Sequence, residues 1–128
     1  MVQTDSSALS VARAHVEAWS NHNYDKARSS LAHDVRVTAT TTQPIMPATD
    51  LSGIDAYMTG LIQFAQAVIP GSACELAAVG DQRNALIMLT VEANFGGGQV
   101  TLPGARLYLL DDDNKIKVEQ VVFFASGS

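Results

Sequence analysis

The second half of the chain contains four segments that favour β-strands, separated by short polar turns. The turns GDQR, GGG and DDDN are rich in the residues that tight connections require, and connections this short join consecutive strands into antiparallel pairs. A chain with such a second half has to build a sheet and to cover at least one apolar face of it. The four segments are SACELAAV (72–79), NALIMLTVEANF (84–95), QVTLPGARLYLL (99–110) and KIKVEQVVFFA (115–125).

The first 32 residues supply two helical patterns. Asp5 or Ser6 is the expected cap of the first helix, and a polar turn at residues 20–23 ends it. A second, shorter helix is predicted over residues 24–32. In the first helix, the residues that recur at helical spacing are Ala8, Ala12, His15 or Val16, and Trp19.

The middle of the chain predicts one strand and one helix. VRVTATTT (35–42) is rich in β-branched residues, and the prolines within 44–47 indicate a loop. Ser52 and Asp55 resemble a capping box that begins a third helix, which Pro70-Gly71 ends. Its expected inner face contains Ile54, Tyr57, Met58, Leu61, Ala65 and Val68.

The order of these elements and the composition predict one α+β domain over residues 1–128. Hydrophobic residues make up 47% of the chain and charged residues 16%, which is typical of a packed globular protein. Because the helices come mostly first and the strands last, we expect three N-terminal helices packed on one face of a curved antiparallel sheet.

Charge and cysteine content exclude several classes of function. The net charge of −5 and the scattered lysines and arginines argue against binding to nucleic acid or to a membrane surface. Cys74 has no partner for an internal disulfide, which favours a cytoplasmic location. The three histidines, at 15, 22 and 33, lack metal-ligand spacing, so the sequence predicts neither a metal site nor a cofactor.

Three stretches carry a resemblance to the nuclear transport factor 2-like superfamily, in its SnoaL-like and ketosteroid-isomerase-like branch. They are AWSNHNYDKARSSLAHDVRV at the first turn, LSGIDAYMTGL at the third helix and LYLLDDDNKIKVEQVVFF at the last hairpin, where the family often has glycine in place of Asn114. The resemblance covers nearly the whole chain. It implies a cone-shaped fold in which helices and a strongly curved sheet enclose a mainly apolar pocket.

The carboxylates that known enzymes of this superfamily use are missing at the matching positions. The resemblance puts the isomerase base at the end of the first strand, where VTATTT has none. It puts the acidic and basic residues of limonene-epoxide-hydrolase-like members at Ile87, Leu89 and Val121. Neither reaction is therefore expected, because a general base must lie within hydrogen-bond reach of its proton.

His15 and Arg106 are the candidate catalytic residues that remain. The resemblance places His15 where isomerases have a pocket-facing tyrosine, and Arg106 where they have a buried aspartic acid. His15 is either a proton carrier in the pocket or a core histidine that a backbone carbonyl satisfies. Arg106 either binds a ligand oxygen, with Glu119 neutralising its charge, or forms a cross-strand ion pair with Glu119 that stabilises the sheet.

Two functions follow from this pattern. One is a SnoaL-like domain that binds a small hydrophobic molecule and acts on it as an isomerase or cyclase. The other is a non-catalytic homodimerisation module with a vestigial cavity, since residues 86–91 and 121–125 are apolar on both faces of their strands. Trp19 is expected to pack the first helix on the sheet. The residues expected to contact a ligand are Trp19, Tyr57, Leu61, Leu89, Tyr108, Glu119, Val121 and Phe123.

Overall fold

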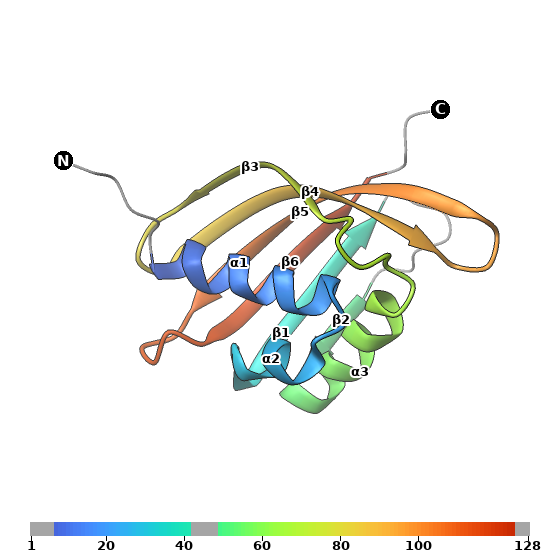
Figure 1. Ribbon diagram of the computed structural model, residues 1–128. Coiled ribbons are helices and arrows are strands. Elements are labelled where there is room, and N and C mark those ends of the chain that lie inside the picture. Colours follow the sequence, from blue (N-terminus) through green and yellow to red (C-terminus); the bar gives the residue numbers. More distant parts are fainter. Residues whose placement is uncertain (1–6, 42–48, 125–128) are drawn as a thin grey trace.

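The computed structural model describes residues 7–41 and 49–124, which form three helices and one six-stranded sheet (Figure 1). The sheet has the strand order β2-β1-β6-β5-β4-β3. The expected caps Asp5 and Ser6 lie outside the described residues. The elements are α1 (Ser7–Ser20), α2 (Tyr24–Ser29), β1 (Leu31–Thr41), β2 (Thr49–Ser52), α3 (Ile54–Ala65), β3 (Cys74–Gly80), β4 (Asn84–Asn94), β5 (Gln99–Leu110) and β6 (Ile116–Phe123).

The pairing of β1 differs from the expected antiparallel sheet. The four strands β3 to β6 form an antiparallel meander, as their short turns predicted. β1 instead pairs with β6 in parallel, with Val37 opposite Glu119 and Ala39 opposite Val121. No hairpin joins β1 and β6, so turn chemistry does not set their relative direction. The parallel pairing brings β1 next to β6 and so joins β1 and β2 to the four-stranded meander in one sheet.

The strand β2 was not predicted, and it takes the place of the expected capping box at the start of α3. Ser52 is the last residue of β2 and pairs with Arg36, so it does not cap the helix. Gly53 stands at the N-cap with φ +91°, a conformation that L-residues with side chains rarely adopt, and no side chain of the described residues caps this end. Gly53, the first glycine in LSGIDAYMTGL, therefore makes the sharp turn from β2 into α3.

α3 also ends earlier than the Pro70-Gly71 signal predicted. Its last residue is Ala65, and the next residues turn to pair with the end of β4. The Asn94 amide donates to the Ala67 carbonyl, and Val68 forms a bridge with Ala93. Pairing with β4 thus satisfies backbone groups that a longer helix would have bonded internally.

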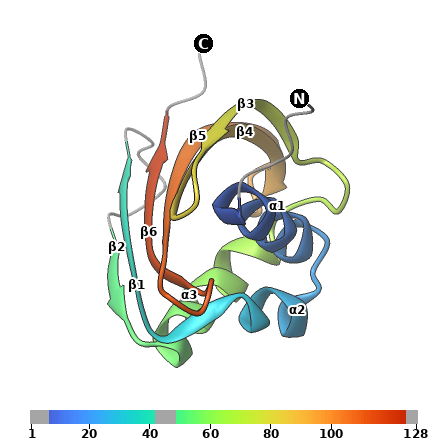
Figure 2. The same cartoon turned by 90° about the vertical axis from the view of Figure 1, so that its left-hand side faces the viewer.

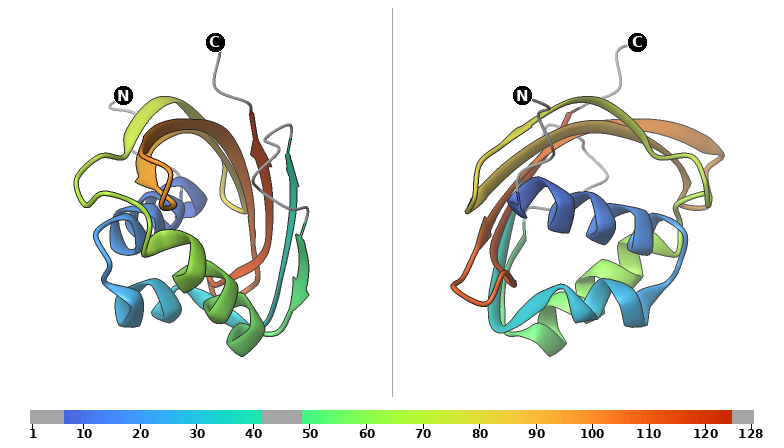
Figure 3. Two further views of the ribbon diagram at one scale, coloured as in Figure 1. Left: turned by 90° about the vertical axis from the view of Figure 1, so that its right-hand side faces the viewer. Right: turned by 60° about the vertical axis from the view of Figure 1, so that its left-hand side comes forward.

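The sheet curves around the helices, with α1 on its concave side and α3 across the open end (Figures 2 and 3). Side chains from α1, α3 and the concave sheet face form one buried core. Gly104 allows β5 and β6 to approach closely, because an added Cβ would lie 2.8 Å from the Val122 carbonyl oxygen. In the described part of the chain, every helix is too short or too polar to cross a membrane.

Candidate functional site

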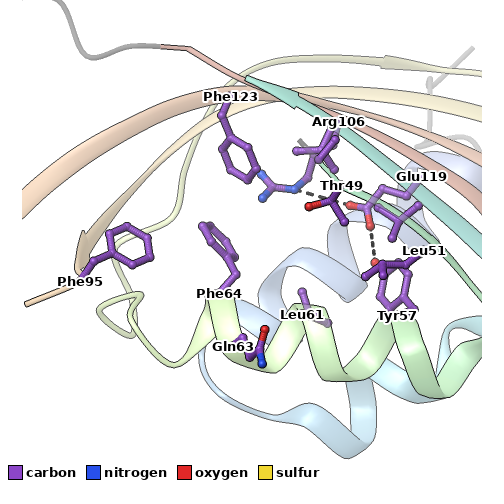
Figure 4. A pocket seen from close by; sticks show the side chains of 14 residues that line it. Thr49, Leu51, Tyr57, Leu61, Gln63, Phe64, Phe95, Arg106, Glu119 and Phe123 are labelled. Atoms are coloured by element: carbon purple, nitrogen blue, oxygen red, sulfur yellow. Dashed lines mark hydrogen bonds and ion pairs between the residues drawn. The ribbon is translucent and has the colours of Figure 1, made fainter. Parts of the chain in front are cut away.

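A pocket of about 430 Å³ opens between α3 and the concave face of strands β1, β2, β5 and β6 (Figure 4). Tyr57, Arg106 and Glu119 bring polar groups to its inner end, and Thr49 and Gln63 contribute two more polar side chains. The hydrocarbon side chains of its lining are Val37, Ala39, Leu51, Leu61, Phe64, Phe95, Val121 and Phe123, together with the backbone of Gly60.

Arg106 on β5 and Glu119 on β6 form a buried ion pair in this lining. The Arg106 Nε atom lies 3.5 Å from Glu119 Oε2, and the two residues are only 4% and 3% exposed. They are diagonal neighbours, since Arg106 stands opposite Val121 and Glu119 opposite Tyr108. The structure therefore contains the cross-strand Arg106–Glu119 ion pair, and both of its residues also line the pocket.

Three aromatic rings surround the guanidinium of Arg106. Its Cζ atom lies 4.7 Å from the ring centre of Trp19, 5.5 Å from that of Phe123 and 5.8 Å from that of Phe64. Such contacts stabilise a desolvated cation through the ring quadrupole. Among the described residues its one polar contact is Glu119, which engages the Nε side of the group. The terminal nitrogens are thus available to an acceptor in the pocket.

Tyr57 links the ion pair to the first helix. Its hydroxyl donates to Glu119 Oε1 and also lies 2.9 Å from His15 Nε2. Burial raises the pKa of Tyr57 well above its usual value, and the negative charge of Glu119 raises it further. The phenol therefore keeps its proton and acts as a neutral bridge between a carboxylate and an imidazole.

His15 lies behind Tyr57 and is fully buried. Its Nδ1 atom is 3.1 Å from the Ala27 carbonyl oxygen. Burial lowers the pKa of His15 below its usual value of 6.5, although the charge of Glu119 and the Ala27 carbonyl act in the opposite direction. His15 does not face the pocket, although the resemblance places it where isomerases have a pocket-facing tyrosine. Of the two candidate catalytic residues, only Arg106 is among the lining residues, because the Tyr57 side chain stands between His15 and the pocket.

Trp19 and Tyr108 lie beside this network without completing their hydrogen bonds. Neither the Trp19 indole N–H nor the Tyr108 hydroxyl has a partner within the residues that the structure describes. Burial raises the pKa of Tyr108 well above its usual value, and the charge of Glu119 adds to the shift. Trp19 is fully buried and packs edge-on against Phe64, with ring centres 5.7 Å apart, which fits the packing role expected for it.

The structure brings most of the predicted site residues together and leaves four outside the lining. The lining includes Tyr57, Leu61, Arg106, Glu119, Val121 and Phe123. Trp19 and Tyr108 lie behind Arg106 and Glu119, and His15 lies behind Tyr57. Leu89 instead borders a second hollow, of about 350 Å³, beside α1 and β3.

Several lining residues were not predicted, although the sequence pattern around some of them indicates that they face inward. Val37 and Ala39 alternate with exposed or half-buried residues of β1, so strand parity placed them on the inner face. Gly60 and Phe64 follow Tyr57 at helical spacing. Phe95, just beyond the end of β4, had no such signal. No group of three or more metal-binding side chains gathers anywhere in residues 7–41 and 49–124.

Comparison with solved structures identifies the same architecture in other proteins. A protein from Kribbella flavida is 24% identical and superposes with a TM-score of 0.77, covering 93% of this chain and 88% of its own. Rv0760c from Mycobacterium tuberculosis, in complex with estradiol-17beta-hemisuccinate, is 14% identical with a TM-score of 0.76 over 91% and 93% of the two chains. An LEH-like epoxide hydrolase from M. tuberculosis is 17% identical with a TM-score of 0.70 over 91% and 82%.

At these identities the likeness to solved structures shows the fold alone. The comparison with curated proteins finds no match. The sequence itself matches the family profile of the SnoaL-like domain over residues 12–119, from the middle of α1 to the middle of β6. The match includes His15, Tyr57, Arg106 and Glu119. The chain therefore belongs to the SnoaL-like domain family.

Proposed function

We propose that this chain binds a small hydrophobic molecule in the pocket between α3 and the sheet. The observation that carries the proposal is the pocket of about 430 Å³, in which hydrocarbon side chains surround a buried Arg106–Glu119 pair at the inner end. A pocket of this kind excludes water from the ligand body and orients it through a few polar groups. The ligand class that fits is an apolar body with one acceptor oxygen.

The oxygen of such a ligand is placed by Arg106. Its terminal nitrogens donate toward the pocket, while the Nε atom stays with Glu119. The surrounding rings of Trp19, Phe64 and Phe123 keep water away, which strengthens a charge-assisted hydrogen bond. The solved complex of Rv0760c with estradiol-17beta-hemisuccinate supports this class, because that ligand combines a steroid with an acid group.

The reaction class that fits this site is a proton-transfer isomerisation or a cyclisation. Glu119 is the carboxylate that lines the pocket, and Arg106 is placed to stabilise negative charge that develops on a ligand oxygen. Neither residue stands where the resemblance puts the bases of ketosteroid isomerases or epoxide hydrolases, so those two activities are not part of the proposal. A cytoplasmic location remains a prediction from the single cysteine.

A thermal-shift screen with a blocked-pocket variant tests binding. The panel pairs hydrophobic compounds with and without an acid group, beginning with estradiol and estradiol-17beta-hemisuccinate. We expect acids to raise the wild-type midpoint more than their neutral partners do. Leu61→Trp fills the pocket and should abolish the shift, whereas Thr59→Trp on the exposed side of α3 should keep it. A panel without any hit, or equal shifts in both variants, would contradict the proposal.

Dimerisation through the outer face of the sheet is a second candidate function. The observation that favours it is a group of apolar side chains on neighbouring strands, in which the exposed Val79 of β3 stands opposite the exposed Leu86 of β4, and Leu86 stands opposite the half-buried Leu107 of β5. Apolar patches on adjoining strands usually mark an interface. Phe64 and Phe123 line an open pocket. Dimerisation and ligand binding are therefore compatible.

A further inference from the structure

A continuous hydrogen-bonded chain runs from α2 to the pocket. It passes from the Ala27 carbonyl to His15 on α1, then to Tyr57 on α3 and to Glu119 on β6. The three side chains are nearly or fully inaccessible to solvent, and only Tyr57 and Glu119 reach the pocket lining. Figure 4 shows the last link, with the Tyr57 hydroxyl directed at the Glu119 carboxylate.

With its three side chains in their usual ionisation states at neutral pH, this chain has one proton fewer than its hydrogen bonds require. The Ala27 carbonyl only accepts, so His15 Nδ1 must carry a proton. Two links remain, His15 to Tyr57 and Tyr57 to Glu119, and each needs its own proton. A neutral imidazole, a phenol and a carboxylate supply only the phenolic one. One link would then join two acceptors, which is costly in a buried site.

One added proton satisfies both links, and it has two equivalent places. In the first arrangement His15 is an imidazolium that donates to the Tyr57 oxygen, while Tyr57 donates to the Glu119 carboxylate. In the second, Glu119 is a carboxylic acid that donates to Tyr57, while Tyr57 donates to the neutral His15. Both arrangements contain the same number of protons and use the same heavy-atom positions.

We propose that His15, Tyr57 and Glu119 form a proton relay that holds one shared proton, with Tyr57 passing it between the buried imidazole and the pocket-facing carboxyl group. In the transfer from His15, the Nε2–H bond breaks and its proton bonds to the Tyr57 oxygen. The phenol releases its original proton to Glu119 Oε1. Tyr57 is a neutral phenol before and after the step, so only His15 and Glu119 change charge.

The groups around the relay act on both arrangements. Arg106 and Tyr108 face it from β5, Glu119 from β6 and Tyr57 from α3. The Arg106 Nε atom lies 3.5 Å from Glu119 Oε2, so the arginine cation attracts the arrangement in which the negative charge is on Glu119 and the proton is on His15. Burial of His15 lowers its pKa and favours the neutral imidazole, with the proton on Glu119. These opposing influences leave neither end of the relay as the only site for the proton.

Use of the relay in a reaction rests on the proposed function. A proton leaving a bound ligand would bond to Glu119 Oε2, while the Oε1 proton moves to Tyr57 and the phenolic proton moves to His15 Nε2. The ligand keeps the electron pair of the broken bond and becomes an anion beside Arg106, and His15 becomes the cation. The reverse steps return the proton to another ligand atom, which is what an isomerisation requires.

Nuclear magnetic resonance of the ligand-free wild-type protein tests the relay. Nitrogen-15 signals of His15 are followed through a pH titration together with carbon-13 signals of Tyr57 Cζ and Glu119 Cδ. The relay predicts that Nδ1 stays protonated and that all three residues report one common step, because they share the proton. The ring signals of the exposed His33, recorded in the same sample, serve as an internal control.

Two variants separate the relay from a merely structural network. Tyr57→Phe keeps the ring but removes the bridging oxygen, so His15 and Glu119 should titrate in separate steps. Glu119→Gln supplies an amide N–H to the Tyr57 oxygen, so the chain closes without an added proton and His15 should stay neutral through the wild-type step.

Independent titration of His15 and Glu119 in the wild-type protein, or a His15 ring protonated on Nε2 alone, would overturn the relay even if neither variant folds. These spectra need no ligand. A common titration step in a chain that binds nothing in the thermal-shift screen would therefore support the relay and contradict the proposed function. Ligand binding with independent titration would do the reverse.

Discussion

The Arg106 guanidinium lies 4.7 Å from the centre of the Trp19 ring. Trp19, the last large residue of α1, therefore packs directly on Arg106, which is the only cationic side chain among the described residues that line the pocket. Trp19 precedes the turn at which α1 ends, where His22 adopts φ +64° and the chain reverses into α2. The tryptophan at this position closes the core over the ion pair. This contact connects the packing of the first helix with the charge in the pocket.

Arg106→Met should destabilise the fold by about 3–5 kcal/mol, because it leaves the Glu119 carboxylate buried without its cation. Arg106→Met combined with Glu119→Gln should recover much of this loss, since no buried charge remains. Urea denaturation of both variants measures the difference. Arg36→Met breaks the exposed Arg36–Asp50 pair and is the matched control with little expected effect. Equal losses for Arg106→Met and Arg36→Met would show that burial of the ion pair has no energetic consequence.

His15→Ala should lower stability by about 2–5 kcal/mol, because it opens a cavity and removes the hydrogen bonds that His15 forms with the Ala27 carbonyl and the Tyr57 hydroxyl. A pocket-lining histidine would cost mainly ligand affinity instead. His33→Ala, at an exposed position, should change the unfolding midpoint little. Unfolding curves compared with ligand titrations distinguish the two cases. A stable His15→Ala protein that binds no ligand would place His15 in the pocket.

The sequence predicted the strands β3 to β6 closely because alternation and turn residues are local signals. Strand parity also placed Arg106, Glu119, Val121 and Phe123 on one face, and all four line the pocket. Helical spacing placed His15 on the inner face of α1 but did not give its depth. The longer Tyr57 side chain reaches between His15 and the pocket from another helix, and this is a tertiary relationship. The parallel pairing of β1 with β6 is non-local in the same way.

Asp81 should make stability depend on acidic pH. Its carboxylate accepts from the backbone N–H groups of Arg83 and Asn84, and these bonds lower its pKa below 3.8. Since the folded pKa is the lower one, the stabilisation is complete above pH 3.8 and is lost as the pH falls toward the folded value. Urea midpoints of wild type and Asp81→Asn should therefore differ at neutral pH and converge in acid. A constant difference across that range would exclude this role.

Assembly through the outer sheet face should make the wild-type protein a dimer at micromolar concentration, with twice the chain mass of 13.6 kDa. The exposed side chains of Leu76 and Val79 on β3, 61% and 64% accessible, and of Met88 on β4 give the apolar surface. Met88→Lys should shift sedimentation toward the monomer, whereas Thr59→Lys on α3 should not. A wild-type protein that sediments as a monomer at this concentration would contradict the proposed dimer.

The position of a bound hydrophobic ligand tests the central claim most directly. Methyl spectra of the protein are recorded while the tightest-binding acid of the thermal-shift panel is added. We expect saturable shifts at one ligand per chain for the lining methyl groups of Val37, Ala39, Leu61 and Val121, with Leu86 and Leu107 on the outer face unchanged. Shifts confined to the outer-face methyl groups, or no saturable shift at any methyl group, would contradict the central claim.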